Sequence, residues 1–274
     1  MRGPGQDFLK VGIGGLGTVG LPVARWLDGS AEGLVLAAVS AGNRQRAEQR
    51  VNDFRTPVPV VGLDELADLC YVIVECAPPG NFLDIAEAAL GAGRILMPLS
   101  VTSLVKHMDL IDLARQTGGR IIVPTGAILG LDAVRAAALG NVRTISMITR
   151  KPPAGLKKAP FVIEQGLDLD GLKEAVLLFE GPVAEAAAKF PANVNVAVAL
   201  SLAGIGPDKT QYQIWADPGV QRNTHVIKVD ADTASFEMTI RVVPTEENPA
   251  TGEIVCLSVM ETLRGLVAPF KVGT

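Results

Sequence analysis

The sequence KVGIGGLGTVG, residues 10–20, decides the fold class of this 274-residue chain. An apolar run leads into Gly15, Gly17 and Gly20, which are spaced as Gly-x-Gly-x-x-Gly, and a helix-like stretch follows. In such a turn the first glycine permits the bend, the second lets the backbone approach a pyrophosphate, and the third lets the helix pack closely on the strand. Amides at the start of the helix then face the phosphates. We therefore expect a dinucleotide to bind at Gly15, Leu16, Gly17, Thr18, Val19 and Gly20.

The alternation of strand and helix continues through the first half of the chain. Strands are expected at residues 9–13, 35–39, 58–61, 71–74, 95–99 and 120–123, and helices at 18–27, 44–54, 82–90 and 103–116. Strands joined by crossover helices indicate a Rossmann-type, doubly wound parallel sheet in an α/β protein. That context favours dinucleotide binding over the alternative, a glycine-rich turn that binds nothing.

The second half of the chain has a different pattern. Strand-like runs at residues 142–149, 211–215, 226–229 and 236–243 are longer, and a short polar turn joins the last two, as in a hairpin. Helices are expected at 169–190, with a break at Gly181, and at 194–202. We expect a dinucleotide-binding domain over residues 1–124 and an α+β substrate domain with a mixed or antiparallel sheet over 125–251. The segment 252–274, with a helix at 259–267, is expected to pack back on the first domain.

Composition limits the classes of function. Hydrophobic residues make up 48% of the chain and charged residues 20%, which excludes a disordered protein, and no apolar run reaches the ~18 residues of a membrane-spanning helix. The 25 basic and 29 acidic residues are scattered, which argues against a nucleic-acid partner. The first residues lack an export signal, so we expect a cytoplasmic protein. Cys70, Cys76 and Cys256 lack metal-ligand spacing and are expected to be buried thiols, with no metal site.

The end of the second expected strand bears on the choice of dinucleotide. NAD-binding proteins often carry a carboxylate there for the ribose hydroxyls, whereas this chain has Ser40, Asn43 and Arg44. A guanidinium suits the 2′-phosphate of NADP. We therefore expect these three residues to contact the cofactor and NADP to be favoured over NAD. The alternative for Arg44 and Arg46 is the solvated face of a polar helix.

The chain has two histidines. His107 lies on an expected helix of the first domain, and we expect no chemical role for it. His225 ends a polar loop at the entry to a strand, where a rigid scaffold can aim an imidazole at a substrate. An imidazole that titrates near neutrality suits acid or base catalysis. The alternative is a surface or packing histidine.

Two further polar segments stand out. Asn193 and Asn195 precede an apolar helix, and one of them is expected to cap it, a role that suits Asn193 better than Asn195. Residues 124–132 follow the sixth expected strand, at the sheet edge where ligands of this architecture bind.

Together these motifs resemble the L-aspartate dehydrogenases, a family of NAD(P)-dependent amino-acid dehydrogenases. The resemblance spans nearly the whole chain, over residues 15–20, 74–77, 99–101, 125–132, 149–153, 178–181, 190–197, 216–218, 223–225 and 247–249. It implies hydride transfer between C2 of L-aspartate and C4 of the nicotinamide. The product, iminosuccinate, reacts with water to give oxaloacetate and ammonia. We also expect a homodimer.

The resemblance also implies roles for individual residues. It places His225 at the active site, where we assign it as the acid or base toward the amine or imine and its water, with Asp217 next to be tested. It implies that Ala127 and Asn195 contact the cofactor, and Ala77, at a strand end, is expected to do so as well.

Lys151 and Arg222 are candidates for binding the substrate carboxylates, because both lie close to the matching motifs. The chain departs from the family at residues 100–103, which read Ser-Val-Thr-Ser where Ser-Val-Gly-Ala is frequent. The added side chains crowd a stretch near the cofactor and bear on substrate or cofactor preference.

Two other functions stay open on the sequence alone. One is a related two-domain reductase, of the homoserine dehydrogenase or dihydropicolinate reductase type, that acts on another oxo or imino acid. The other is a dinucleotide-binding protein without catalysis.

Overall fold

The computed structural model describes residues 8–29, 31–248 and 251–273. These divide into two units. The first comprises the described residues up to Pro124 together with Val255–Val272, and the second consists chiefly of Thr125–Ile254. Within the described residues, no helix is both long enough and apolar enough to cross a membrane.

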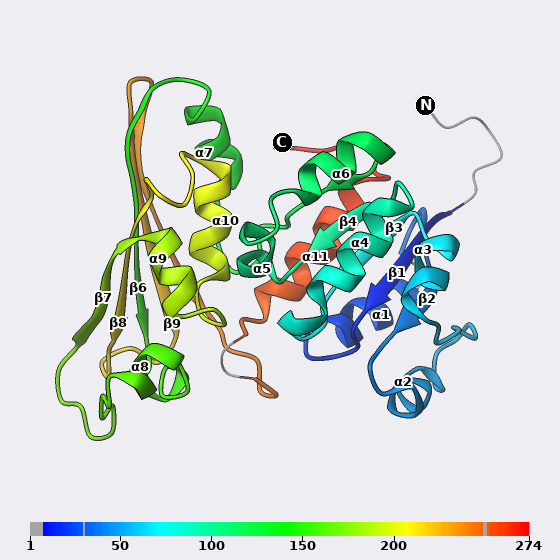
Figure 1. Cartoon of the computed structure of the whole chain (residues 1–274), viewed down its shortest axis with the longest axis horizontal. Helices are drawn as coiled ribbons and strands as arrows, with labels where there is room; N and C mark the ends of the chain where they lie inside the picture. The colour runs from blue at the N-terminus through cyan, green and yellow to red at the C-terminus, as the bar shows by residue number, and fades with distance from the viewer. Residues whose placement is uncertain (1–7, 30, 249–250, 274) are drawn as a thin grey trace. The chain divides into compact units, whose positions relative to one another are not determined.

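The first unit is built on a parallel sheet of order β2-β1-β3-β4-β5, as its strand and helix pattern predicts. Its strands are β1 (Leu9–Gly14), β2 (Leu34–Ser40), β3 (Val72–Glu75), β4 (Ile95–Pro98) and β5 (Arg120–Ile121). Its helices are α1 (Gly20–Asp28), α2 (Arg44–Val51), α3 (Leu63–Leu69), α4 (Phe82–Gly91), α5 (Val101–Val105), α6 (Leu110–Thr117) and α11 (Ile254–Gly265), with a short 3₁₀ turn η1 (Pro79–Asn81). Helices cover both faces of the sheet (Figure 1). The winding direction changes between β1 and β3, which is where such sheets bind ligands.

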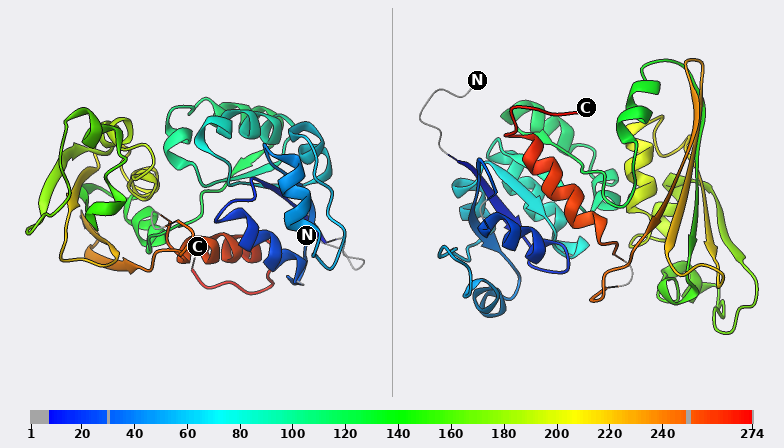
Figure 2. Two further views of the ribbon diagram at one scale, coloured as in Figure 1. Left: turned by 90° about the horizontal axis from the view of Figure 1, so that it is seen from below. Right: turned by 180° about the vertical axis from the view of Figure 1, so that it is seen from behind.

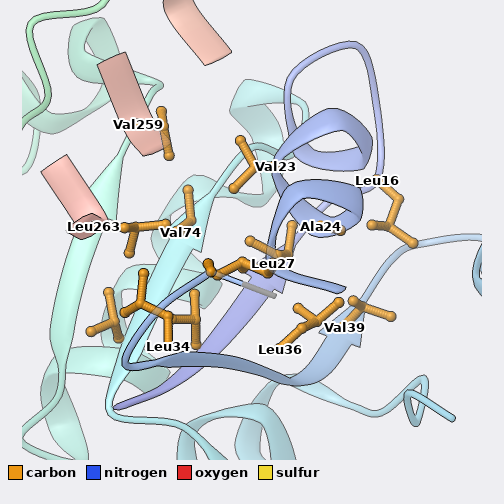
Figure 3. Close-up of a cluster of buried hydrophobic side chains, with 14 of the residues drawn as sticks. Leu16, Val23, Ala24, Leu27, Leu34, Leu36, Val39, Val74, Val259 and Leu263 are labelled. Carbon is orange, nitrogen blue, oxygen red and sulfur yellow. The ribbon is translucent and has the colours of Figure 1, made fainter. Parts of the chain in front are cut away.

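Helix α11 comes from the far end of the sequence and completes the core of this unit. Val259 and Leu263 are fully buried, in one apolar cluster with Val23 and Leu27 of α1 and Val74 of β3 (Figure 3). Figure 2 shows α11 lying along the sheet. Burying each such side chain stabilises the fold by about 1.5–3 kcal/mol, so the unit depends on this segment.

The second unit contains a mixed sheet of order β10-β9-β6-β8-β7, in agreement with the predicted fold class. Its strands are β6 (Val142–Lys151), β7 (Val176–Pro182), β8 (Gln211–Ala216), β9 (Asn223–Ala231) and β10 (Ser235–Val242). Strands β6 and β8 are parallel, and the other neighbours are antiparallel. Its helices are α7 (Leu131–Ala137), α8 (Pro160–Glu164), α9 (Val183–Lys189) and α10 (Asn195–Ala203), with a 3₁₀ turn η2 (Pro153–Gly155). Helices α7, α9 and α10 lie on one face of the sheet (Figure 1).

The helix predicted over residues 169–190 is wrong for most of its length. Val176–Pro182 form the edge strand β7, which pairs antiparallel with β8, and only Val183–Lys189 are helical. An apolar run such as VLLF, residues 176–179, has no period that separates a strand from a helix, so pairing with β8 decides its structure.

Smaller differences occur elsewhere. Residues 58–61 form no strand, and Val60 makes only an isolated bridge to Val39. Helix α3 has no counterpart in the prediction, and the helix predicted at 103–116 is two helices, α5 and α6. Helix α11 ends at Gly265, and Pro269, which cannot donate a backbone hydrogen bond, lies soon after it.

Candidate functional site

The glycine turn lies where several parallel strands end together. Gly14, the last residue of β1, pairs with Ser40 in β2 and with Glu75 in β3, and Glu75 pairs in turn with Pro98 in β4. The carboxyl ends of four neighbouring strands are therefore aligned. In doubly wound sheets this edge, next to the change in winding direction, is the ligand site.

The three glycines of the turn meet different steric limits. Gly15 has a φ of +104°, and a Cβ there would lie 2.6 Å from the Cys76 carbonyl oxygen. A Cβ on Gly20 would lie 1.9 Å from the Gly15 carbonyl oxygen, so side chains are excluded at both positions. A Cβ on Gly17 would meet no atom within 4 Å, so this stretch of backbone faces open space.

The turn therefore fits a dinucleotide, because its middle glycine leaves room for a pyrophosphate while the outer two hold the turn against β3 and α1. Helix α1 begins at Gly20, two residues later than predicted, so Thr18 and Val19 belong to the turn itself.

Ser40 and Asn43 flank the turn through contacts with the backbone. The Ser40 carbonyl accepts a hydrogen bond from the Gly15 amide at 2.7 Å. The Asn43 side chain caps α2, because its Oδ1 accepts a hydrogen bond from the Arg46 amide at 2.9 Å. One function of Asn43 is therefore to start the helix that follows β2.

Two arginines of α2 face different surroundings. Arg44, whose side chain is 72% exposed, forms an ion pair with Glu48 at 2.9 Å. Arg50 donates a hydrogen bond to the Leu16 carbonyl and so stabilises the backbone of the glycine turn. The sequence pattern does not distinguish Arg50 from the other arginines of this helix.

Glu75 organises the loops that follow β3 and β4. Its buried carboxylate accepts hydrogen bonds from the amides of Ala77 at 3.1 Å, Leu99 at 3.2 Å and Ser100 at 2.9 Å, and from the Ser100 hydroxyl at 3.0 Å. Burial raises the pKa of Glu75, and these hydrogen bonds act in the opposite direction. Glu75 thereby fixes Ala77, a predicted cofactor contact. A lone carboxylate ending an apolar strand is the sequence signal for such a role.

A second group of polar residues lies in the second unit. Thr149 of β6 pairs with His225 of β9, and Lys151 lies two residues further along β6 on the same face. The side chains of Thr149 and His225 are joined by a hydrogen bond of 3.0 Å between Oγ1 and Nδ1. All three residues are buried, and Lys151 is only 5% exposed. Pairing across the sheet thus brings together residues that are 76 positions apart in the chain.

Lys151 is held by the segment that leads into α10. Its Nζ donates to the carbonyl oxygen of Asn193 at 3.3 Å and to the Asn193 Oδ1 at 3.4 Å. Burial lowers the pKa of Lys151 to about 8. Neither asparagine caps the helix, since α10 begins at Asn195 and the cap residue is Val194, so that expectation is wrong.

His225 differs from its prediction in two respects. It lies within β9 rather than in the preceding loop. Burial, assisted by the positive charge of Lys151, lowers its pKa to about 3. The expectation of an imidazole that titrates near neutrality is therefore wrong, because the protonated form is poorly solvated and faces a cation. His225 is neutral at neutral pH, and Lys151 is the neighbour that titrates close to that range.

Asp217 adjoins Lys151 through its backbone, since its amide donates a hydrogen bond to the Lys151 carbonyl at 2.9 Å. The Asp217 carboxylate is bound by Arg150 at 3.0 Å, and Arg150 alternates with Thr149 and Lys151 along β6, so the Arg150 side chain belongs to the opposite face of the sheet. Arg222 is exposed in the loop before β9.

Ala127 and His107 lie in different units, Ala127 in the second and His107 in the first. Ala127 is half-buried in the loop between β5 and α7, flanked by Gly126 and Gly130, which have φ values of +64° and +70°. His107, in the first unit, lies 6.2 Å from the ring of Phe82.

Comparison with known proteins gives two family matches and close relatives. Residues 15–124 match the NAD-binding domain of homoserine dehydrogenase, and residues 132–266 match the C-terminal domain of aspartate dehydrogenase. An L-aspartate dehydrogenase of Bradyrhizobium diazoefficiens is 50% identical over 97% of this chain and 94% of its own length. L-aspartate dehydrogenase 3 of Bordetella bronchiseptica is 48% identical over 98% and 99%. The crystal structure of aspartate dehydrogenase from Thermotoga maritima has the same fold, with a TM-score of 0.72 at 24% identity over 97% of this chain and all of that one.

Proposed function

This chain belongs to the L-aspartate dehydrogenase family, and we propose that it oxidises L-aspartate with its first unit binding the nicotinamide dinucleotide and its second unit handling substrate and protons. A nicotinamide dinucleotide held at the glycine turn of Gly15, Gly17 and Gly20 would supply the hydride-transfer chemistry at C2 of aspartate. Our proposal that the second unit handles substrate and protons rests on Lys151 and His225, which are both buried on one face of its sheet.

Lys151 and His225 suit different parts of this reaction. The aspartate ammonium group must lose a proton before the hydride leaves C2, and the water that attacks the imine must lose one as well. Lys151 has a pKa of about 8, so its amine exchanges protons near neutral pH. His225, with a pKa of about 3, stays neutral and offers a hydrogen bond to substrate or water without changing charge.

A steady-state assay tests this function directly. We expect oxidation of NADH or NADPH with oxaloacetate and ammonia, and slower oxidation with other 2-oxo acids. A faster reaction with another oxo acid would indicate a related reductase. Tight dinucleotide binding without turnover of any amino acid would instead indicate a non-catalytic protein.

The glycine turn gives a prediction about dinucleotide affinity. Gly17→Val is expected to weaken dinucleotide binding by about 10- to 100-fold, because a branched side chain displaces phosphate from backbone amides, and a hydrogen bond to a charged group contributes about 1.5–3 kcal/mol. The fold should survive, since a Cβ at Gly17 meets nothing within 4 Å. Isothermal titration calorimetry measures the affinity. Gly91→Val, at the last residue of α4 and with no neighbour within 4 Å of its Cβ, is the matched control. Parental affinity in Gly17→Val would mean that the turn is misassigned.

We further propose that NADP is preferred over NAD and that Arg44 contributes to the preference. Arg44→Ala should raise KM for NADPH about fivefold more than KM for NADH, since a charge-assisted contact to an exposed 2′-phosphate contributes on the order of 1 kcal/mol. Arg115→Ala is the control, because Arg115 has a comparable exposed ion pair, with Asp112, on α6. Equal changes in the two KM values would contradict the proposal.

For its assembly we propose a homodimer. Sedimentation velocity should then show a species of twice the chain mass, and a monomer at assay concentrations would contradict this.

A further inference from the structure

Tyr212 is a buried tyrosine whose hydroxyl the proposed function does not use. It lies on β8, is 1% exposed, and its hydroxyl makes no well-formed hydrogen bond with the described residues. A buried phenol without a partner costs free energy, so its position calls for an explanation.

The sheet register places Tyr212 opposite Met147 and therefore diagonally across from Thr149 on the same face of the sheet. Thr149 pairs with Ile214 across β6 and β8, and Tyr212 lies two residues before Ile214 on the same face. Burial raises the pKa of Tyr212, and its interaction with the Thr149 hydroxyl acts in the opposite direction. The Thr149 hydroxyl therefore faces a phenol on one side and, at 3.0 Å, Nδ1 of His225 on the other.

Only one direction of hydrogen bonding gives an acceptor to both hydroxyl protons, those of Tyr212 and Thr149. If Tyr212 donates to Thr149 Oγ1, the Thr149 hydroxyl donates to Nδ1 of His225, and the imidazole proton resides on Nε2. In the reverse direction Nδ1–H donates to Thr149 and Thr149 donates to Tyr212. The phenol proton is then left buried without an acceptor, which costs about 1–3 kcal/mol.

We propose that Tyr212 and Thr149 form a relay that holds His225 in the tautomer with its proton on Nε2. The relay is complete when the Tyr212 hydroxyl donates to Thr149 Oγ1. Tyr212 and Thr149 are positioning residues, because they act on the reaction only through His225. Their importance for catalysis rests on the proposed function, but the tautomer itself does not.

The relay gives His225 a defined hydrogen-bonding character. The imidazole presents an N–H donor at Nε2 and no acceptor on that nitrogen, so it is suited to bind an oxygen, such as a substrate carboxylate or a carbonyl that develops negative charge. It does not abstract a proton there. The proton transfers then fall to Lys151, in agreement with the pKa of about 8 given by its burial.

Nitrogen NMR of histidine-labelled protein tests the relay directly. The chain has two histidines, and His107→Gln identifies the signals of His225. In the parent at neutral pH we expect a protonated nitrogen at Nε2 and an unprotonated one at Nδ1. Tyr212→Phe and Thr149→Val should each shift the population toward the other tautomer, whereas Thr149→Ser, which keeps the hydroxyl, should retain the parental pattern. A proton on Nδ1 in the parent, or an unchanged pattern in both Tyr212→Phe and Thr149→Val, would overturn the proposal.

Kinetics of the same variants connect the tautomer to the reaction. Tyr212→Phe keeps the aromatic ring in the core and should lower kcat about two- to tenfold, the equivalent of one hydrogen bond, while KM for the dinucleotide stays constant. Thermal unfolding shows whether each variant keeps its fold, and Tyr212→Phe with Thr149→Ser suffices if Thr149→Val does not fold. The predicted NMR pattern in an enzyme that turns over no aspartate would refute the proposed function and leave the relay standing.

Discussion

Replacing His225 with alanine is expected to lower kcat by roughly 10²–10³, because the variant loses a positioned hydrogen-bond donor that acts in the transition state. The affinity for the dinucleotide should stay near the parental value, since the glycine turn and its supporting residues belong to the first unit. Stopped-flow or steady-state kinetics with aspartate, together with calorimetric titration of the dinucleotide, separate the two effects.

Because His225 is neutral, a variant with a neutral hydrogen-bond donor provides a further comparison. His225→Gln keeps a side-chain N–H donor, so it should lose less activity than His225→Ala. The ionisation near pH 8 in kcat/KM should persist in His225→Gln, because the pKa of His225 is about 3 and that ionisation belongs to Lys151. His107→Ala is the control and should be nearly silent. Near-parental kcat in His225→Ala would show that this histidine is structural.

Lys151→Met is expected to lower kcat for aspartate oxidation by roughly 10²–10⁴ and to abolish the pH dependence near 8. In the parent, kcat/KM for aspartate should rise as pH increases through about 8, where the amine loses its proton and becomes a base. The reductive reaction needs the acid form, so its rate should fall over the same range.

Lys151→Arg distinguishes proton transfer by Lys151 from an effect of its positive charge alone. Lys151→Arg keeps the cation but does not titrate, so it should remain as inactive as Lys151→Met if the lysine transfers protons, and should recover activity if it only binds a carboxylate. The pH dependence of the free energy of unfolding measures the Lys151 pKa independently of catalysis. Because the pKa of Lys151 in the folded protein is about 8 against an ordinary 10.5, the unfolded chain binds more protons between these values and the free energy of unfolding rises with pH there. Lys151→Met should lose that part of the slope.

The two sites differ in how much of them the sequence reveals. The glycine turn is local: Gly15, Gly17 and Gly20 lie within six residues, and their spacing specifies a strand, a bend and a helix. The turn could therefore be predicted with its ligand class. The support from Arg50 could not be predicted, because Arg50 becomes distinctive only when α2 is placed beside the turn, and the sequence signal for Glu75 does not reveal which amides it binds.

The polar cluster in the second unit, in contrast, is formed by residues that are distant in the sequence. His225 was identifiable from its motif, but its partners Thr149 and Tyr212 look like ordinary strand residues until the register of β6, β8 and β9 is known. For the same reason the sequence predicted the wrong titration for His225. An unperturbed imidazole titrates near neutrality, and the shift depends on burial and on Lys151, which are properties of the folded sheet.

The fold class, the glycine turn and the family could be predicted from the sequence, because they depend on the local spacing of glycines, on strand and helix periodicity and on the order of short motifs. The folded structure was needed to show that residues 176–182 are an edge strand and that a neutral His225 lies beside a lysine with a lowered pKa, whereas packing of the C-terminal segment on the first domain was already expected from the sequence. The physical reason is that strand pairing and desolvation arise from contacts between distant segments. No pattern within a single segment encodes which side chain will be buried against which charge.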